Sequence, residues 1–230
     1  MAFIRPFEPK DTEDAKFICR ATLPPSLAAS PEAYAMAPYL WTLQFTHLFP
    51  QNCFVLDDGS GKVVGYIIGV PDVFAFADRY GEYVKVVLES EQGRKDVPVP
   101  RQLQTQEKWT REDGTPNPEA LAQSAYNVDW LVLDGVEGKR ELVETYRAML
   151  HIDLLEPFQG KGFGKKMIEI FVDSVKKVAS ESEGRYDYGK GIQLGVAGEN
   201  TKVVKFYEKV GFRVYPGGEK EGNVWMVRDF

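Results

Sequence analysis

The sequence predicts a mixed α/β fold, in which a predominantly antiparallel sheet carries helices on both faces. Two runs of β-branched and aromatic residues flank a glycine turn at 59–61, which indicates an antiparallel hairpin. Two strand-to-helix units follow each other at 149–176 and 192–210, and such units place parallel strands beside covering helices. A short strand pair, 212–215 with 223–227, closes the chain. Together these observations predict one mixed sheet between helical layers.

Length and charge limit the class of protein further. The chain has 230 residues, 43% of them hydrophobic and 13% aromatic, so it is long enough to bury a sizeable core and we expect a single domain over 1–230. The 34 acidic and 28 basic residues leave a net charge of −6, which disfavours nucleic acid as a partner. Apolar runs are shorter than the ~18 residues of a membrane span, and the N-terminus lacks the apolar block of a signal peptide. We therefore expect a cytoplasmic protein, with the nucleus as the alternative, and no membrane partner.

The two cysteines indicate no redox or metal site. Cys19 and Cys53 lie in apolar segments without a CxxC spacing, and the only histidines, His47 and His151, are not beside them in the sequence. We expect both thiols to be reduced core residues and no metal to be bound.

The first 70 residues predict a strand, two helices and the hairpin. Acidic residues at 11–14 mark the start of the first helix, which ends before Pro24. The second helix opens near Ser30, and we expect a break at Pro38. In order, the elements cover 3–7, 11–22, 30–47 and 53–70.

The segment 74–145 has a different character, and we interpret it as an insert between the third and fourth core strands. It begins with a helical pattern over 76–88, but its middle, 91–118, is polar and rich in Pro, Gln and Gly. The segment has too little apolar content for a core of its own, whereas Trp109 and Trp130 argue against a plain linker. We expect a partly ordered excursion that forms a wall of the substrate site.

The second half of the chain carries the chemistry. A strand at 149–155 runs into the glycine-rich loop 159–164, and an amphipathic helix follows. A second strand covers 192–197, and Asn200 with Thr201 is expected to cap the next helix, which ends at Gly211.

The loop 159–164 suits a pyrophosphate, because a strand that leads through glycines into a helix presents backbone N–H groups at a positive helix end. Lys165 stands where GxGxxG of a dinucleotide fold needs its third glycine. Gln159 and Lys166 replace the first glycine and the Ser/Thr of a P-loop, so both nucleotide motifs fit poorly. A loop that uses glycine for geometry alone is the structural alternative.

The same loop resembles the hallmark of the GNAT acetyltransferase superfamily, [RQ]-x-x-G-x-[GA], which here is Gln159, Gly162 and Gly164. The segment 200–212 is similar to that superfamily's closing motif N-x-x-A-x-x-F-Y-x-x-x-G-F, with Val204 in place of the common alanine. A closer resemblance, over 65–76, 151–155 and 191–196, is to the acetyltransferase-like C-terminal domain of O-GlcNAcase and its free-standing microbial relatives. The glycosidase half of those proteins is absent here.

The resemblance implies a GNAT-like acyl-CoA N-acyltransferase fold that holds acetyl-CoA between two splayed strands, 150–155 and 192–197. It implies that a backbone N–H near Leu154 or Leu155 polarises the thioester carbonyl. The residues expected to bind acetyl-CoA are Leu154, Leu155, Gln159, Gly160, Lys161, Gly162, Phe163, Gly164, Asn200 and Tyr207.

Acetyl transfer to an amine also needs a proton donor for the thiolate and a base for the amine. Tyr207 is similar to the superfamily tyrosine near the CoA sulfur, and a core aromatic is its alternative role. Candidate bases are His151 and Asp153, which share one strand face, and Asp72, which follows the third strand. Their alternative roles are a core histidine and turn-capping carboxylates.

These observations predict an N-acetyltransferase that moves the acetyl group of acetyl-CoA directly to an amine in a ternary complex. The alternative is an inactive acetyl-CoA-binding or protein-interaction module. The sequence does not identify the amine, which a small molecule, peptide or protein would supply, nor the oligomeric state.

Overall fold

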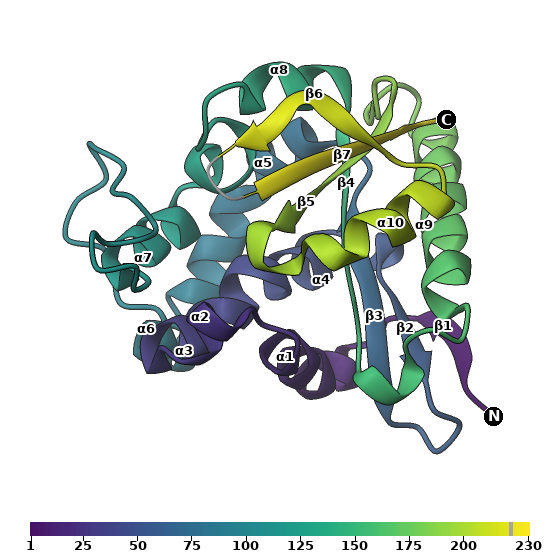
Figure 1. Ribbon diagram of the computed structural model, residues 1–230, viewed down its shortest axis with the longest axis horizontal. Helices are drawn as coiled ribbons and strands as arrows, with labels where there is room; N and C mark the ends of the chain where they lie inside the picture. Colours follow the sequence, from purple (N-terminus) through teal and green to yellow (C-terminus); the bar gives the residue numbers. More distant parts are fainter. Residues whose placement is uncertain (221–222) are drawn as a thin grey trace.

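The computed structural model describes residues 1–220 and 223–230, which form one seven-stranded sheet in the order β1-β2-β3-β4-β5-β7-β6 (Figure 1). Neighbouring strands are antiparallel except β4 and β5, which are parallel. The predicted fold class, a mixed and mostly antiparallel sheet with helices on both faces, is therefore confirmed. The strands are β1 Phe3–Pro6, β2 Phe54–Asp57, β3 Val63–Val70, β4 Ala148–Leu154, β5 Gly191–Ala197, β6 Arg213–Lys220 and β7 Asn223–Asp229.

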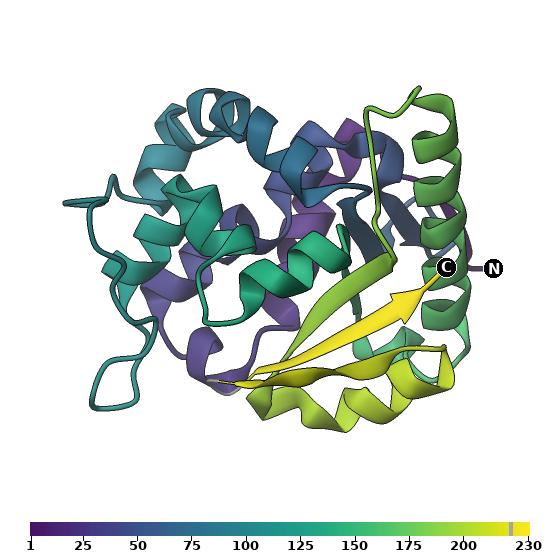
Figure 2. The same ribbon diagram turned by 90° about the horizontal axis from the view of Figure 1, so that it is seen from above.

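Helices cover both faces of this sheet (Figure 2). The α-helices are α1 Thr12–Ala21, α2 Pro25–Ala28, α3 Pro31–Trp41, α4 Leu43–Leu48, α5 Val73–Tyr83, α6 Glu91–Asp96, α7 Pro118–Tyr126, α8 Lys139–Thr145, α9 Phe163–Glu181 and α10 Val204–Lys209. The 3₁₀ turns are η1 Pro9–Asp11, η2 Pro50–Asn52, η5 Glu156–Phe158 and η6 Gly198–Val203, and the π turns are η3 Val84–Leu88 and η4 Asp129–Leu133. In the described part of the chain, no helix is both long and apolar enough to cross a bilayer.

The two faces of the sheet build separate hydrophobic cores, because successive strand residues point to opposite sides. On one face, Tyr66 and Ile68 of β3 join a core with side chains of α1, α3, α4 and α5. On the other face, Ile67 and Leu150 pack with α9 and with Tyr207 of α10. Along β4, odd-numbered residues therefore face α1 and even-numbered residues face α9.

The insert is more ordered than expected, because its apolar side chains complete the core that α3 and α4 begin. Tyr80 and Tyr83 of α5 are buried, and their hydroxyls donate to the carbonyls of Ala125 and Tyr39 at 2.9 and 2.8 Å. Only 97–117 lacks helices and strands over a long stretch. The expectation of a partly ordered excursion is thus wrong for the parts on either side of that stretch, which a shared core stabilises. The assignment of residues 1–230 to a single domain, with an insert at 74–145, stays a prediction.

Two predicted helix boundaries are wrong. Pro38 lies inside α3 rather than at a break, and the chain turns at Thr42, whose φ and ψ of −133° and −60° end the helix. Asn200 does not cap α10, because the 3₁₀ turn η6 carries the chain past it and Val203 takes the N-cap position. In contrast, Gly211 ends α10 as predicted, with a left-handed φ of 92°. Both cysteines are free and buried, also as predicted.

Candidate functional site

The central feature of the site is the separation of β4 from β5. Ala148 pairs with Ile192 and Met149 with Gln193, and in the described chain these are the only pairs between the two strands. Beyond them β4 stays paired with β3, and β5 stays paired with β7 (Figure 1). Gly195 is solvent-exposed in the middle of β5, where β4 no longer covers it. The strands thus form a V with its vertex at the Met149–Gln193 pair, in the segments that the sequence predicted to splay.

The backbone of β4 presents free groups along the open side of this V. Leu155 donates its N–H to the carbonyl of Val64 at 3.0 Å, so residues of the same parity point their N–H groups toward β3. The N–H groups of Leu154 and Ile152 therefore point into the V. Of the two residues expected to polarise a thioester, Leu155 is wrong, because its N–H is already bonded to Val64. The sequence did not indicate Ile152, because only the register between β3 and β4 determines which N–H groups of β4 point into the V.

The loop 159–164 lies at the mouth of the V, and two of its glycines adopt backbone conformations that other residues avoid. Gly160 and Gly162 have φ of 69° and 82°, and apart from the neighbouring residues no atom of the described chain lies within 4 Å of the position that a Cβ would occupy. Gly162 is the N-cap of α9, and no side chain caps the helix. The first N–H groups of α9 therefore remain available at the positive end of a long helix, which is the arrangement that binds anions.

The other residues of the loop fix its position. The Gln159 side chain donates from Nε2 to the Leu154 carbonyl at 2.7 Å, which ties the loop to the end of β4. A Cβ on Gly164 would lie 3.0 Å from the Phe206 ring, so this glycine permits α9 to approach α10 closely. Phe163 packs on the α9 core, and the Lys161 amine lies 5.6 Å from the centroid of the Phe158 ring, outside the core.

On the α1 face of the sheet, polar side chains form a connected network beside the V. His151 Nε2 lies 3.0 Å from Asp153 Oδ2, and the Tyr66 hydroxyl donates to the same oxygen at 2.6 Å. Tyr66 and Asp153 are directly paired across β3 and β4, and the Thr42 hydroxyl lies 3.4 Å from that of Tyr66. The His151 side chain is 37% exposed and that of Asp153 19%. The imidazole is therefore the part of the network that a second molecule reaches.

The network keeps Asp153 ionised. Burial alone would raise the pKa of the Asp153 carboxyl, but the charge and hydrogen bond of His151, with hydrogen bonds from Tyr66 and Thr22, outweigh it and hold the pKa below the usual 3.8. Burial and the Asp153 charge raise the pKa of Tyr66 well above its ordinary value, so the phenol stays protonated and donates. The carboxylate thus orients the imidazole and is itself a weak base.

Tyr207 approaches the same region from α10. Its side chain is 9% exposed and packs against Phe206 and Phe212, with ring centroids 5.2 and 5.7 Å away. Burial, followed by the charge of Asp153, raises the pKa of the Tyr207 hydroxyl, so it stays protonated at neutral pH. The residue is thus a core aromatic with a protonated hydroxyl, and its role as a proton donor to the thiolate stays a prediction.

Asp72 lies apart from this group, and its side chain serves the fold. Its Oδ1 accepts from the N–H of Phe74 at 2.9 Å as the N-cap of α5, and its Oδ2 accepts from the N–H of Asp187 at 3.1 Å. The next residue bonds to the Arg147 carbonyl, which places Asp72 beyond the far end of β4 from Asp153. Asp72 is therefore wrong as a candidate base, and the capping alternative holds.

Sequence patterns missed a second polar group at the vertex. Gln193 is fully buried, and its Oε1 accepts from Lys139 Nζ at 2.9 Å. The Lys139 amine also lies 5.5 Å from the centroid of the Trp225 ring. A glutamine inside the apolar run 191–197 was the only signal for this group. Within the described residues, no cluster of three or more His, Cys, Asp or Glu side chains is arranged to hold a metal.

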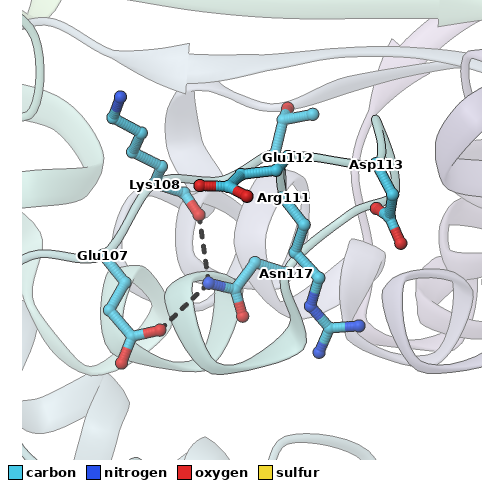
Figure 3. A pocket seen from close by; sticks show the side chains of 7 residues that line it. Glu107, Lys108, Arg111, Glu112, Asp113 and Asn117 are labelled. Carbon is cyan, nitrogen blue, oxygen red and sulfur yellow. Dashed lines mark hydrogen bonds between the residues drawn. The ribbon is translucent and has the colours of Figure 1, made fainter.

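A hollow of about 610 Å³ lies elsewhere, in the projecting stretch 97–117 (Figure 3). Asn117 donates there to Glu107 and to the Lys108 carbonyl at 3.0 and 3.1 Å, which holds the stretch together. The hollow lacks the apolar walls typical of small-molecule sites. Its lining residues are Glu107, Lys108, Thr110, Arg111, Glu112, Asp113 and Asn117.

A parallel strand pair that splits beside a glycine loop and a helix start defines a class of acyl-CoA-binding folds, and comparison with solved structures agrees. The chain has the fold of the GNAT acetyltransferases, as the sequence resemblance predicted. The structure of SsHAT is 25% identical, covers 99% of this chain and 98% of its own, and has a TM-score of 0.74.

Two further structures share the fold at lower identity. PH1933 from Pyrococcus horikoshii OT3 is 15% identical with a TM-score of 0.52, and the match covers 100% of this chain and 99% of that one. The PaiA N-acetyltransferase from Thermoplasma acidophilum, in complex with coenzyme A, is 12% identical over the same shares, with a TM-score of 0.51. No protein-family model matches the chain.

Proposed function

We propose that the protein is an N-acetyltransferase that transfers the acetyl group of acetyl-CoA directly to an amine in a ternary complex. The observation that carries this proposal is the V between β4 and β5, which opens at its mouth onto the glycine loop 159–164. One end of the site offers N–H groups to an anion and the other offers an unpaired strand edge. A molecule with a pyrophosphate at one end and an amide-containing arm at the other matches both.

The loop and β4 would hold acetyl-CoA. The N–H groups at Gly162 and the first turn of α9, with the nearby Lys161 amine, bind the pyrophosphate. The free N–H groups of Leu154 and Ile152 pair with the pantetheine arm as an added strand edge. Ile152 lies nearer the vertex, so its N–H is our candidate for polarising the thioester carbonyl.

The α1 face would receive the acceptor amine. An alkyl amine has a pKa of ~10.4 and arrives protonated, so a base must take a proton before attack. We assign this role to His151, held by Asp153, and assign to Tyr207 the return of a proton to the departing thiolate. With a net charge of −6, the chain favours encounter with basic acceptors such as polyamines or basic peptides.

Ligand-dependent thermal stability tests the cofactor. Acetyl-CoA and CoA, but not ATP or NAD, should raise the melting temperature, because a ligand at 100 times its dissociation constant adds about 2.7 kcal/mol. Gly162→Glu should abolish the shift through charge repulsion at the loop. Because Gly162 has a φ of 82°, any side chain there strains the backbone, so Gly162→Ala is the matched control and should keep a shift. Equal shifts with Gly162→Glu and wild type would contradict the pyrophosphate assignment.

Turnover tests the chemistry. Tyr207→Phe removes the hydroxyl but keeps the packed ring, so CoA release with a reactive amine should fall about 10²-fold while acetyl-CoA affinity changes little. Unchanged turnover would remove Tyr207 from the mechanism.

A second function follows if His151 does not act as the base, because Asp153, whose pKa is held low, is a poor base in its place. The site would then bind acetyl-CoA as an interaction module without turnover. Binding with no CoA release over background, across a panel of amines, would favour that module.

A further inference from the structure

The hydrogen-bonded pair of Lys139 and Gln193 lies at the vertex of the V. The proposed function directs the acetyl group of bound acetyl-CoA toward this end. Lys139 is the first residue of α8, and its Nζ donates to Gln193 Oε1 at 2.9 Å. Gln193 pairs with Met149 in the last rung that joins β5 to β4. The amine is thus tied to the residue at which the V begins.

The amine also lies on the face of the sheet that would receive an acceptor. Directly paired residues of parallel strands point to the same side, so Gln193 shares a face with Met149 and with His151, two positions further along β4. On β7, Trp225 supplies the ring beside the Lys139 amine, and it is paired with the exposed Gly195 of β5. The exposed backbone of Gly195 therefore lies next to the Trp225 ring that contacts the Lys139 amine, and Gly195 adds no side chain of its own there.

The surroundings of Lys139 favour a neutral and therefore nucleophilic amine. Burial lowers the pKa of Lys139 to about 8, against an ordinary value of 10.5. Its position in the first turn of α8 acts in the same direction, because helix N-termini disfavour cations. The amide of Gln193 orients the amine without supplying a compensating charge, and its own Nε2 is buried without a hydrogen-bond partner among residues 1–220 and 223–230.

We propose that Lys139 is an acetylation site of the protein itself, modified from acetyl-CoA bound in the same chain. The neutral Nζ attacks the thioester carbonyl carbon, an N–C bond forms and the C–S bond breaks. The proton lost by the amine passes to the thiolate, so the products are Nε-acetyl-Lys139 and free CoA. The inference rests on the proposed function, because it needs acetyl-CoA to lie in the V with its acetyl group at the vertex.

The test follows labelling of individual lysines in the full-length wild-type chain. The protein is incubated with acetyl-CoA that carries an isotopically labelled acetyl group, without any amine acceptor, and peptides are mapped by mass spectrometry over time. Lys139 should acquire label at least about tenfold faster than Lys177, an exposed lysine of α9, because binding holds donor and amine together. Its rate should not depend on protein concentration, as expected for a reaction within one molecule.

Variants separate this reaction from background chemistry. Gly162→Glu should remove the fast labelling of Lys139 and leave the slow labelling of Lys177. Lys139→Arg should lose one acetyl group from the intact mass, and Lys177→Arg should leave the rate at Lys139 unchanged.

The failure of this inference differs from failure of the proposed function. If acetyl-CoA raises the melting temperature but Lys139 is labelled no faster than Lys177, Lys139 is not a self-acetylation site and the proposed function stands. If acetyl-CoA produces neither a thermal shift nor labelling above background, both are overturned.

Discussion

Asp153 and His151 show how neighbouring groups divide the work of one reaction. The Asp153 carboxylate accepts a hydrogen bond from Tyr66 and contacts the imidazole of His151. These contacts stabilise its ionised form, so it binds a proton weakly. The second ring nitrogen of the imidazole makes no contact with the carboxylate and points to the more exposed side of the network, where it can meet a second molecule. This division predicts that the charge of Asp153 matters to stability as well as to activity.

The pH dependence of stability tests that charge. The folded-state pKa of Asp153 lies below the ordinary 3.8, so its contribution is present above that value and is lost as pH falls through the folded-state pKa. We expect Asp153→Asn to lower the free energy of unfolding at neutral pH by ~1.5–3 kcal/mol, the range for hydrogen bonds to a charged group. The difference from wild type should shrink below pH 3.8.

Urea unfolding at a series of pH values measures this difference. Asp173→Asn, at an exposed position of α9, is the control and should follow wild type throughout. A constant difference between Asp153→Asn and wild type at all pH values would show that packing, and not charge, explains the loss.

At the scale of elements, β3 and α9 pack closely because Gly69 of β3 has no side chain. A Cβ on Gly69 would lie 2.7 Å from the Phe171 ring of α9 and would also collide with the Met149 carbonyl of β4. Gly69 therefore lets Phe171 of α9 and the start of β4 both approach the backbone of β3. This contact positions the start of β4 relative to α9.

Two glycine-to-alanine substitutions of opposite effect test this contact. Gly69→Ala should destabilise the protein by ~1–3 kcal/mol, the usual cost of overpacking. Gly81→Ala in α5, where the new Cβ meets nothing within 4 Å, should stabilise it by ~0.5–1 kcal/mol because alanine favours helices. Thermal or urea unfolding of the pair gives both signs. A stabilising Gly69→Ala would mean that α9 does not pack against β3 as described.

Sequence patterns predicted elements well where one local rule decides the structure. The apolar stripe of α9, the glycine hairpin between β2 and β3 and the Gly211 helix end each depend on residues within a few positions. Predictions failed where contacts with a distant segment determine the local structure. Pro38 stays helical in a fully packed core, and Asp72 caps a helix because the connection before β5 also needs its carboxylate.

At the scale of the molecule, the candidate site consists of segments that the sequence separates widely. Tyr66 comes from β3, Gln193 from β5 and Lys139 from the insert. Sheet register places Tyr66 and Gln193 on the face of His151, and the hydrogen bond to Gln193 places Lys139 beside them. The loop and Tyr207 were found because family motifs mark them. Gln193 and Lys139 at the vertex were not found, because no neighbouring sequence pattern distinguishes them from ordinary strand or surface residues.

Residues 22–26, which link α1 to α2 and include the start of α2, lie beside the open end of the V. Thr22 lies close enough to help lower the pKa of the Asp153 carboxyl on β4, and the Ser26 hydroxyl donates to Glu199 Oε1 at 2.6 Å, just beyond the end of β5. This connection therefore joins the two strands on the acceptor face at the end where they are not paired. A bond between a hydroxyl and a carboxylate in this position should restrain how far the V opens.

Ser26→Ala should loosen this end of the site without affecting the rest of the fold. Loss of one hydrogen bond, ~0.5–1.5 kcal/mol, should raise hydrogen exchange of the amides in η6 about two- to tenfold and speed the release of bound acetyl-CoA. Ser180→Ala, on the exposed surface of α9, is the matched control and should change neither. If exchange in 198–203 is the same in Ser26→Ala and wild type, the contact with Glu199 does not restrain the V, and the core beneath α1 must set its opening instead.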